Sequence, residues 1–175
     1  MTVGGGVELR KAEASDAATF AAWELDPVFC AHNDWSFGSP QDESIEWWTR
    51  SLGQPDVELT RLVALVEGEV VGYVDLHGAE ADIKELGYAV APSERWGTGM
   101  GTALARTGLA YGFEQLRLER IWAEAIEANA ASVRILERVG MREIGPGEPA
   151  VLLGQTSRYR RIEISRVEFL AAAPG

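Results

Sequence analysis

The sequence predicts a single mixed α/β domain with an antiparallel first half and a βαβ unit in the middle. Three observations support this prediction. The chain has 175 residues, which is the size of one domain. Consecutive strand-like runs around a glycine turn occupy residues 62–90, as in an antiparallel hairpin and its neighbour. A glycine-rich loop over residues 95–102 then joins the last of these runs to a long helical stretch.

The first part of the chain predicts one short strand and two helices. Residues 7–10 alternate apolar and polar side chains, as a strand does. Asp16, with the serine before it, supplies the N-cap of a helix that the Asp26-Pro dipeptide ends. Residues 28–42 are expected to be irregular. A second helix, with an aspartate or a serine as its cap, carries the apolar side chains of residues 45–52.

The rest of the chain alternates between strand and helix patterns. Strands are predicted by apolar alternation or by runs rich in β-branched residues, and helices by apolar positions on one helical face. In order, we expect strands at residues 62–66, 70–76 and 84–90, a helix at 102–116, a strand at 120–126, a helix at 130–139, and strands at 151–153 and 159–167.

Composition excludes several classes of protein. Sixteen Lys and Arg stand against 27 Asp and Glu, for a net charge of −11. A nucleic-acid partner is therefore not expected, because phosphate binding needs a basic surface. No apolar run approaches the roughly 20 residues of a membrane span, and the first six residues lack a signal-peptide pattern. Cys30 is the only cysteine, which excludes an intrachain disulfide and a Cys-rich zinc site and suggests a reducing, cytoplasmic location.

The glycine-rich loop reads Arg-Trp-Gly-Thr-Gly-Met-Gly-Thr over residues 95–102. Glycines let the backbone approach a ligand, and amides at a helix start bind anions, so the loop predicts a phosphate or pyrophosphate site. A flexible strand-to-helix turn is the alternative. A dinucleotide-binding fold would use Thr102 and an acid such as Glu127, but too few βα units follow. A P-loop needs a lysine that this loop lacks.

Four segments in this order and spacing resemble the GNAT superfamily of acyl-CoA-dependent N-acyltransferases, most of all its RimJ/RimL-like branch. They are residues 85–92, 96–102, 118–121 and 127–141. The resemblance implies an α+β fold with a mixed, mostly antiparallel sheet, helices on both faces and a V-shaped split between two neighbouring strands. We expect one domain over residues 7–170, a flexible lead at 1–6 and a tail at 171–175.

The resemblance also implies acetyl-CoA, or a related acyl-CoA, as co-substrate, and no metal. Its pyrophosphate would lie on the glycine-rich loop, and its pantetheine arm would add to the edge of the preceding strand. The implied cofactor-binding residues are Tyr88, Ala89, Val90, Trp96, Gly97, Thr98, Gly99, Met100, Gly101, Thr102, Asn129, Ser132 and Arg134. Two of them have alternative roles: Asn129 is a good helix N-cap, and Arg134 is compatible with a solvated helix face.

Direct attack of a neutral amine on the thioester requires a base. Glu85 is the candidate, since it lies on the strand leading to the loop. Ser132 is the candidate donor to the leaving thiolate, because Leu136 stands where many relatives place a tyrosine acid. A solvent-facing strand glutamate and a plain helical serine are the respective alternatives.

The acceptor site is expected between the first helices, with His32, Trp35, Trp47 and Asp75. Aromatic walls with acids suit a cationic amine, whereas helix packing is the alternative role of the tryptophans. The resemblance implies acetylation of a primary amine, and a protein or peptide N-terminus is the leading candidate for that acceptor. A small amine (aminoglycoside, polyamine or amino acid) and a non-catalytic acyl-CoA-binding module are the alternatives. A homodimer is left open.

Overall fold

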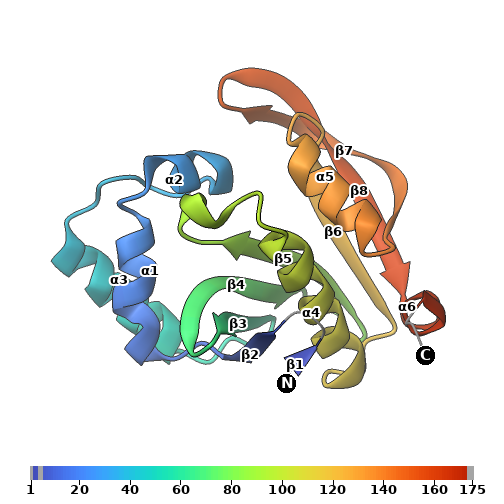
Figure 1. Ribbon diagram of the computed structural model, residues 1–175, viewed down its shortest axis with the longest axis horizontal. Helices are drawn as coiled ribbons and strands as arrows, with labels where there is room; N and C mark the ends of the chain where they lie inside the picture. Colours follow the sequence, from blue (N-terminus) through green and yellow to red (C-terminus); the bar gives the residue numbers. More distant parts are fainter. Residues whose placement is uncertain (1, 4–5, 173–175) are drawn as a thin grey trace.

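The computed structural model describes residues 2–3 and 6–172, whose strands form one sheet in the order β1-β2-β3-β4-β5-β6-β8-β7 (Figure 1). β5 and β6 run parallel, and every other neighbouring pair is antiparallel. This is the mixed, mostly antiparallel sheet of the predicted fold. The strands are β1 (Thr2–Val3), β2 (Val7–Lys11), β3 (Leu59–Val66), β4 (Glu69–His77), β5 (Ile83–Val90), β6 (Arg120–Ile126), β7 (Arg142–Leu152) and β8 (Gln155–Ser165).

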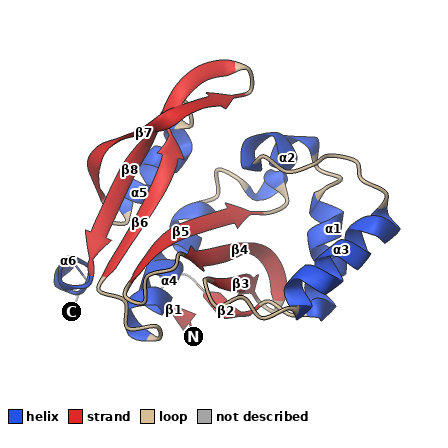
Figure 2. Ribbon diagram, turned by 180° about the vertical axis from the view of Figure 1, so that it is seen from behind, coloured by secondary structure: helices blue, strands red, loops and turns tan. Residues whose placement is uncertain are grey.

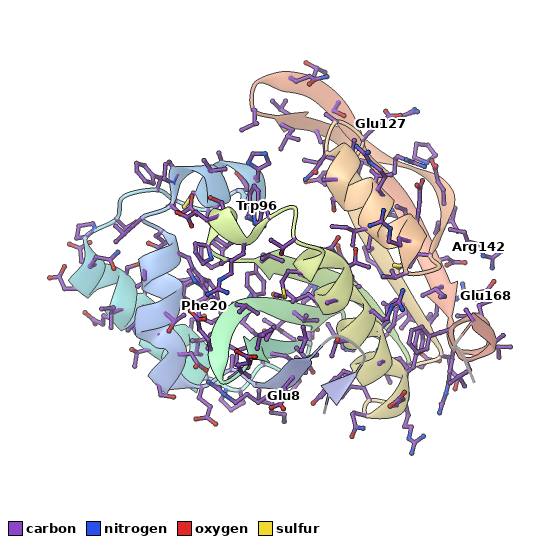
Figure 3. The ribbon with its side chains drawn as sticks, viewed as in Figure 1. Glu8, Phe20, Trp96, Glu127, Arg142 and Glu168 are labelled. Carbon is purple, nitrogen blue, oxygen red and sulfur yellow. The ribbon has the colours of Figure 1, made fainter. Side chains whose placement is uncertain are left out.

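Helices cover both faces of the sheet, as predicted. On one face Leu62 belongs to the core that α4 and α5 complete, and on the other Val63 belongs to the core built by α1, α2 and α3 around Phe20 (Figure 3). Neighbouring residues of β3 thus enter opposite cores, because successive strand side chains alternate. The helices are α1 (Ala17–Trp23), α2 (Pro27–Asn33), α3 (Gln41–Gly53), α4 (Met100–Glu114), α5 (Ala130–Arg138) and α6 (Arg166–Ala172), with 3₁₀ turns η1 (Ala14–Asp16) and η2 (Ser93–Arg95).

The segment after Asp26 is helical, so the expectation that residues 28–42 are irregular was wrong over α2. Asp26 is the N-cap of α2, and one of its oxygens accepts the N–H groups of Val28 and Phe29 at 3.0 Å each. Pro27 fits the first helical position because the N–H it lacks would have no acceptor there. The Asp-Pro dipeptide therefore begins a helix here. Cys30 is buried within this helix, as a small apolar side chain would be.

The last two strands differ from the prediction in length. β7 covers Arg142–Leu152, although residues 151–153 alone were expected. Pro146 and Pro149 argue against a strand in sequence, but β7 is the edge of the sheet and its pairing with β8 shifts register around both prolines. Edge strands tolerate proline because an outward position needs no donor.

β8 ends at Ser165, where the prediction had a strand as far as residue 167. The N–H and Oγ of Ser165 both donate to Glu168, and the Glu168 N–H donates back to Ser165 Oγ at 3.3 Å. This reciprocal capping box starts α6. Its Ser-x-x-Glu spacing is visible in the sequence and was missed.

The predicted terminal segments fall partly outside the described residues, which omit 1, 4, 5 and 173–175. Within the described part, Thr2–Val3 form β1 against β2, so this portion of the expected flexible lead is paired strand. α6 continues to Ala172, past the expected start of the tail at 171. In the described ranges, no helix combines the length and apolar character that crossing a membrane requires.

Candidate functional site

β5 and β6 separate soon after they begin. They pair only over residues 83–85 and 120–122, whereas β4 pairs with β5 as far as Val90. Beyond Glu85 the two strands diverge (Figure 2). One edge of β5 is thus left without a β6 partner along residues 86–90. Such an edge presents main-chain donors and acceptors to an extended ligand.

The glycine-rich loop follows β5 and leads into α4, which begins at Met100, two residues before the predicted start. Gly97 and Gly99 have φ values of 77° and 88°, and a Cβ at either would meet no described atom within 4 Å. Backbone conformation therefore requires these glycines, and the space beside them is open. The first amides of α4 have no acceptor within the helix, so the loop and helix start have the donors that an anion-binding site requires.

Other residues of the loop have structural roles of their own. Thr98 Oγ1 donates to the Arg95 carbonyl at 2.7 Å and so closes the loop on itself. A Cβ at Gly101 would lie 2.7 Å from Ile135 Cδ1, so a larger residue there would displace the end of the Ile135 side chain where α4 packs on α5. Thr102 lies half-buried in the first turn of α4.

Trp96 and Ser93 fasten the loop to β5 and α2. The Trp96 indole N–H donates to the Val90 carbonyl at 2.8 Å, and the Ser93 N–H donates to Asp26 at 2.7 Å. The His32 ring meets the Trp96 ring edge-on, with 5.0 Å between centroids. Figure 3 shows Trp96 beneath α2. His32, predicted for the acceptor site, therefore lies beside the loop.

Tyr88 carries a buried hydroxyl that makes no hydrogen bond within the described part of the chain. Burial raises the pKa of Tyr88 to about 12. The nearby Ser132 side chain lowers this pKa, but by less than burial raises it. An unpaired buried hydroxyl costs about 1–3 kcal/mol, so this group suits a bound partner. Ala89 and Val90 are buried, and the Val90 carbonyl already accepts the Trp96 indole N–H.

The start of α5 holds the remaining cofactor candidates. Asn129 is the N-cap, as its alternative interpretation predicted: its Oδ1 accepts the Ser132 N–H at 3.2 Å. Ser132 therefore lies in the first turn of α5. Arg134 is exposed, and its Nε donates to the Ala130 carbonyl at 3.0 Å.

Glu85 lies where β5 and β6 separate, opposite His77 of β4 and Trp122 of β6. Its side chain is half-buried. Burial raises the pKa of Glu85, the Glu124 carboxylate raises it further, and His77 and Arg161 oppose the rise. Glu124 is itself paired with Arg161 at 2.7 Å. A carboxyl group whose pKa is shifted upward, at a point where strands open, is a candidate general base.

A cavity of about 580 Å³ opens between the end of α1, α3 and β3. The rings of Trp35 and Trp48 stack within it at 5.0 Å, and Trp47 meets Trp48 edge-on at 4.7 Å. The structure thus brings Trp35 and Trp47 together, as predicted for an acceptor site, and places His32 elsewhere. The lining residues are Glu24, Trp35, Ser36, Ser39, Glu43, Ser44, Trp47, Trp48 and Arg61.

Asp75 does not line this cavity itself, but it pairs with Arg61, which does. Arg61 Nε and Nη2 donate to the two Asp75 oxygens at 2.9 and 2.6 Å. The guanidinium also lies over the rings of Trp48 and Tyr73, 5.6 and 5.5 Å from their centroids. Both carboxylate oxygens of Asp75 are thereby occupied, an arrangement that the sequence did not indicate.

The sequence patterns did not single out Glu24, Arg61 or Glu124. Glu124 had a signal: alternation along β6 places it on the same face as Trp122, opposite the buried Ala123. Glu24 and Arg61 lie far apart in the chain and come to line one cavity only when α1 and α3 pack over β3. Among the residues that the structure describes, no group of His, Cys, Asp or Glu is placed to hold a metal ion.

A sequence profile described as the acetyltransferase (GNAT) domain matches residues 7–142. That span contains the glycine-rich loop, the separated strands and α5. The chain belongs to this family of acetyltransferase domains.

Two curated relatives match over part of their length. The Bacillus subtilis (strain 168) protein named "Putative ribosomal N-acetyltransferase YdaF" is 31% identical over 120 residues, 67% of this chain and 64% of that protein. The mycothiol acetyltransferase of Nocardia farcinica (strain IFM 10152) is 36% identical over 92 residues, 53% of this chain and 28% of that protein. The matched part of the chain thus spans less than two thirds of either relative.

Solved structures match nearly the whole chain. A spermidine N-acetyltransferase from Vibrio cholerae, solved with CoA and spermine, has a TM-score of 0.80 at 21% identity and covers 95% of this chain and 99% of its own. A GNAT-family acetyltransferase from Bacillus anthracis has a TM-score of 0.74 at 20% identity, and the match covers 93% of this chain and 96% of that one. At these identities the likeness is one of fold, and it agrees with the GNAT architecture.

Proposed function

We propose that this protein transfers the acetyl group of acetyl-CoA to a primary amine. One observation carries the proposal: the free edge of β5 joins a half-buried carboxyl group, Glu85, to the anion-binding loop at the other end of the strand. A long ligand with a phosphate at one end and a reactive group at the other fits such an edge.

Acetyl-CoA fits the described residues on three grounds. The amides of residues 97–102 suit its pyrophosphate, the β5 edge over residues 86–90 suits its pantetheine arm, and the Tyr88 hydroxyl is buried without a partner. The exposed Arg134 adds positive charge one turn into α5. When bound, acetyl-CoA supplies a thioester whose carbonyl carbon accepts an amine.

Glu85 is the proposed base. An amine is mostly protonated at neutral pH, so a nearby group must remove a proton for attack to occur. The raised pKa of Glu85 suits this task, because a general base works best when its pKa lies near the pH at which the enzyme works. Asp75 suits it less, since Arg61 occupies both of its oxygens.

Ser132 is the proposed donor to the departing thiolate, with the Tyr88 hydroxyl beside it as a second donor. Leu136, where many relatives carry a tyrosine, is buried and has no proton to give. Ser132 and Tyr88 come from α5 and β5, on the two sides of the split. A thiolate that leaves along the strand edge would pass between them.

The acceptor has two leading alternatives. The name of YdaF supports a ribosomal protein N-terminus, and the spermine bound to the Vibrio cholerae enzyme supports a polyamine. The cavity beside Glu24 and Glu43 suits either acceptor, because both are cationic. A non-catalytic acyl-CoA-binding module is the alternative from another class.

Thermal unfolding with acetyl-CoA, followed by mass spectrometry on a panel of peptides and small amines, tests this proposal. Acetyl-CoA should raise Tm, and at least one amine should gain an acetyl group. Glu85→Gln should keep the Tm shift and lower kcat/KM by about 100-fold. Glu80→Gln, an equal change of charge at an exposed position, is the control.

The outcomes separate the alternatives. Unchanged turnover in Glu85→Gln rejects Glu85 as the base. A Tm shift without acetylation of any amine favours the binding module, and no shift with any CoA thioester overturns the proposal.

We extend the proposal to the RimJ/RimL-like branch, a cytoplasmic location and a homodimer. The YdaF match supports the branch, and the single buried cysteine suits a reducing compartment. A protein N-terminus acetylated in preference to every polyamine would support the branch. Sedimentation equilibrium decides the assembly.

A further inference from the structure

Glu24 is a buried carboxylate whose described hydrogen-bond partners are neutral. It is 8% exposed and lies at the C-cap of α1, where it lines the cavity. Ser44 Oγ donates to one of its oxygens, and Trp48 Nε1 donates to the other at 2.9 Å. It forms no ion pair with a basic side chain among residues 2–3 and 6–172. Buried charges are normally paired, so this one lacks its counterion.

The surroundings of Glu24 are negative on balance. Arg61 is the basic residue of the cavity lining, and Asp75 already neutralises it. Glu43, exposed at the rim, adds a second carboxylate. The 54% exposed Trp47 lines the cavity beside the stacked Trp35 and Trp48, and aromatic ring faces attract cations. A carboxylate among indoles is the chemistry that recognises an ammonium group.

The cavity lies away from the place where the thioester would be attacked. Arg61 of β3 is in register with Asp75 of β4, and Asp75 is in register with Gly87 on the free edge of β5. The Arg61 backbone thus lies two strand spacings, about 10 Å, from that edge.

We propose that the Glu24 cavity binds a second cationic group of the acceptor, distinct from the amine that is acetylated. This inference rests on the proposed function, since it assumes a reacting amine at the β5 edge. It selects acceptors with two amino groups, whether long diamines or peptides with a basic side chain near the N-terminus, over monoamines.

Isothermal titration calorimetry without CoA tests the cation site separately from acetyl transfer. The probes are diaminooctane, with an amino group at each end, and octylamine. The diamine should bind more tightly, and Glu24→Gln should weaken its binding by about tenfold or more. The glutamine removes the charge, while its amide oxygen can still accept the Trp48 N–H and its amide NH2 can donate to Ser44 Oγ. Glu46→Gln, the same charge change on the exposed face of α3, should bind as wild type does.

Trp47→Leu is the second variant, because Trp47 is 54% exposed and its replacement should leave the fold intact. Loss of one ring face should weaken diamine binding about two- to fivefold. This variant decides the matter if Glu24→Gln fails to fold. Equal affinity for diamine and monoamine, or unchanged affinity in either cavity variant, overturns the cation site.

Acetylation assays then distinguish the sources of the second charge. Glu24→Gln should raise KM for diaminooctane if the acceptor is a diamine. If the acceptor is a peptide, the variant should raise KM for an Ala-Lys peptide more than for an Ala-Ala peptide. In both cases kcat should change little. If Glu24-dependent diamine binding persists but nothing is acetylated, the cation site stands and the transfer function falls. If acetylation proceeds with monoamines and diamines alike, the transfer function stands and the cation site falls.

Discussion

Glu85 and Glu124 are two carboxyl groups that influence each other at the start of the split between β5 and β6. Glu124 raises the pKa of Glu85, although Arg161 pairs with Glu124 and offsets part of this effect. A base with a raised pKa loses its proton at a higher pH than an ordinary glutamate does. The acidic limb of the rate profile should report this pKa.

Glu124→Gln removes the neighbouring negative charge and frees Arg161, and both changes lower the pKa of Glu85. The acidic limb of kcat/KM should therefore move to lower pH, as measured by initial rates across the acidic to neutral range. Glu85→Gln should lose that limb. A limb that stays in place in Glu124→Gln would count against Glu85 as the titrating base.

The Tyr88 hydroxyl gives a second prediction at the scale of one residue. Tyr88→Phe removes a buried, unpaired group, so the free energy of unfolding of the free protein should stay equal or rise by about 1 kcal/mol. The Tm increase caused by CoA should shrink, because the proposed ligand partner is lost. An unchanged CoA effect on Tm would show that the hydroxyl does not meet the ligand.

Among the elements, α2 is tied directly to the segment that precedes the glycine-rich loop. Asp26 caps this helix and also accepts the Ser93 N–H, just ahead of the loop. Burial pushes the pKa of Asp26 upward, but the hydrogen bonds from Phe29, Ser93 and Val28 outweigh it, and the pKa is lowered. The ionised form therefore stabilises the fold.

Asp26→Ala should lower the free energy of unfolding by about 1–2 kcal/mol, the usual loss for an N-cap. Because the pKa of Asp26 is lower in the folded protein than in the unfolded chain, its contribution to the free energy of unfolding is full above the unfolded-state pKa. That contribution is lost as pH falls through the folded-state pKa. Urea denaturation of wild type and variant should differ at neutral pH and converge in acid. A difference that persists in acid would contradict this role.

The same elements show where local patterns suffice. β6 was predicted with its observed limits, because its apolar residues alternate and its neighbours on both sides are turns. β7 was underestimated, because its two prolines are unfavourable in a central strand and its place at the edge of the sheet is not encoded locally. α2 and α6 did have local signals, an Asp-Pro start and a capping box, so those errors lay in the interpretation.

At the scale of the whole molecule, a net charge of −11 has to coexist with a polyanionic co-substrate. The proposed pyrophosphate site is made of backbone amides and a helix start, which attract anions without basic side chains. We expect the acidic excess to act on the acceptor, since a negative surface attracts cations.

Salt should therefore weaken acceptor binding. We expect the KM of a cationic acceptor to rise with ionic strength, because salt screens the exposed carboxylates over a Debye length of about 10 Å at 0.1 M. Steady-state kinetics at constant pH would measure this, with a neutral osmolyte as control. A flat response would show that the acidic surface does not contribute.

The sequence by itself predicted most of the strands and helices in their order along the chain, and the glycine-rich loop, because strand alternation, helix caps and loop chemistry are local. The resemblance to the GNAT family added the candidates Glu85 and Ser132. Only the tertiary structure decided how charges meet. It paired Asp75 with Arg61, set His32 against Trp96 and buried Glu24 among indoles. These contacts join segments far apart in the chain, and their energies depend on burial, which no local pattern contains.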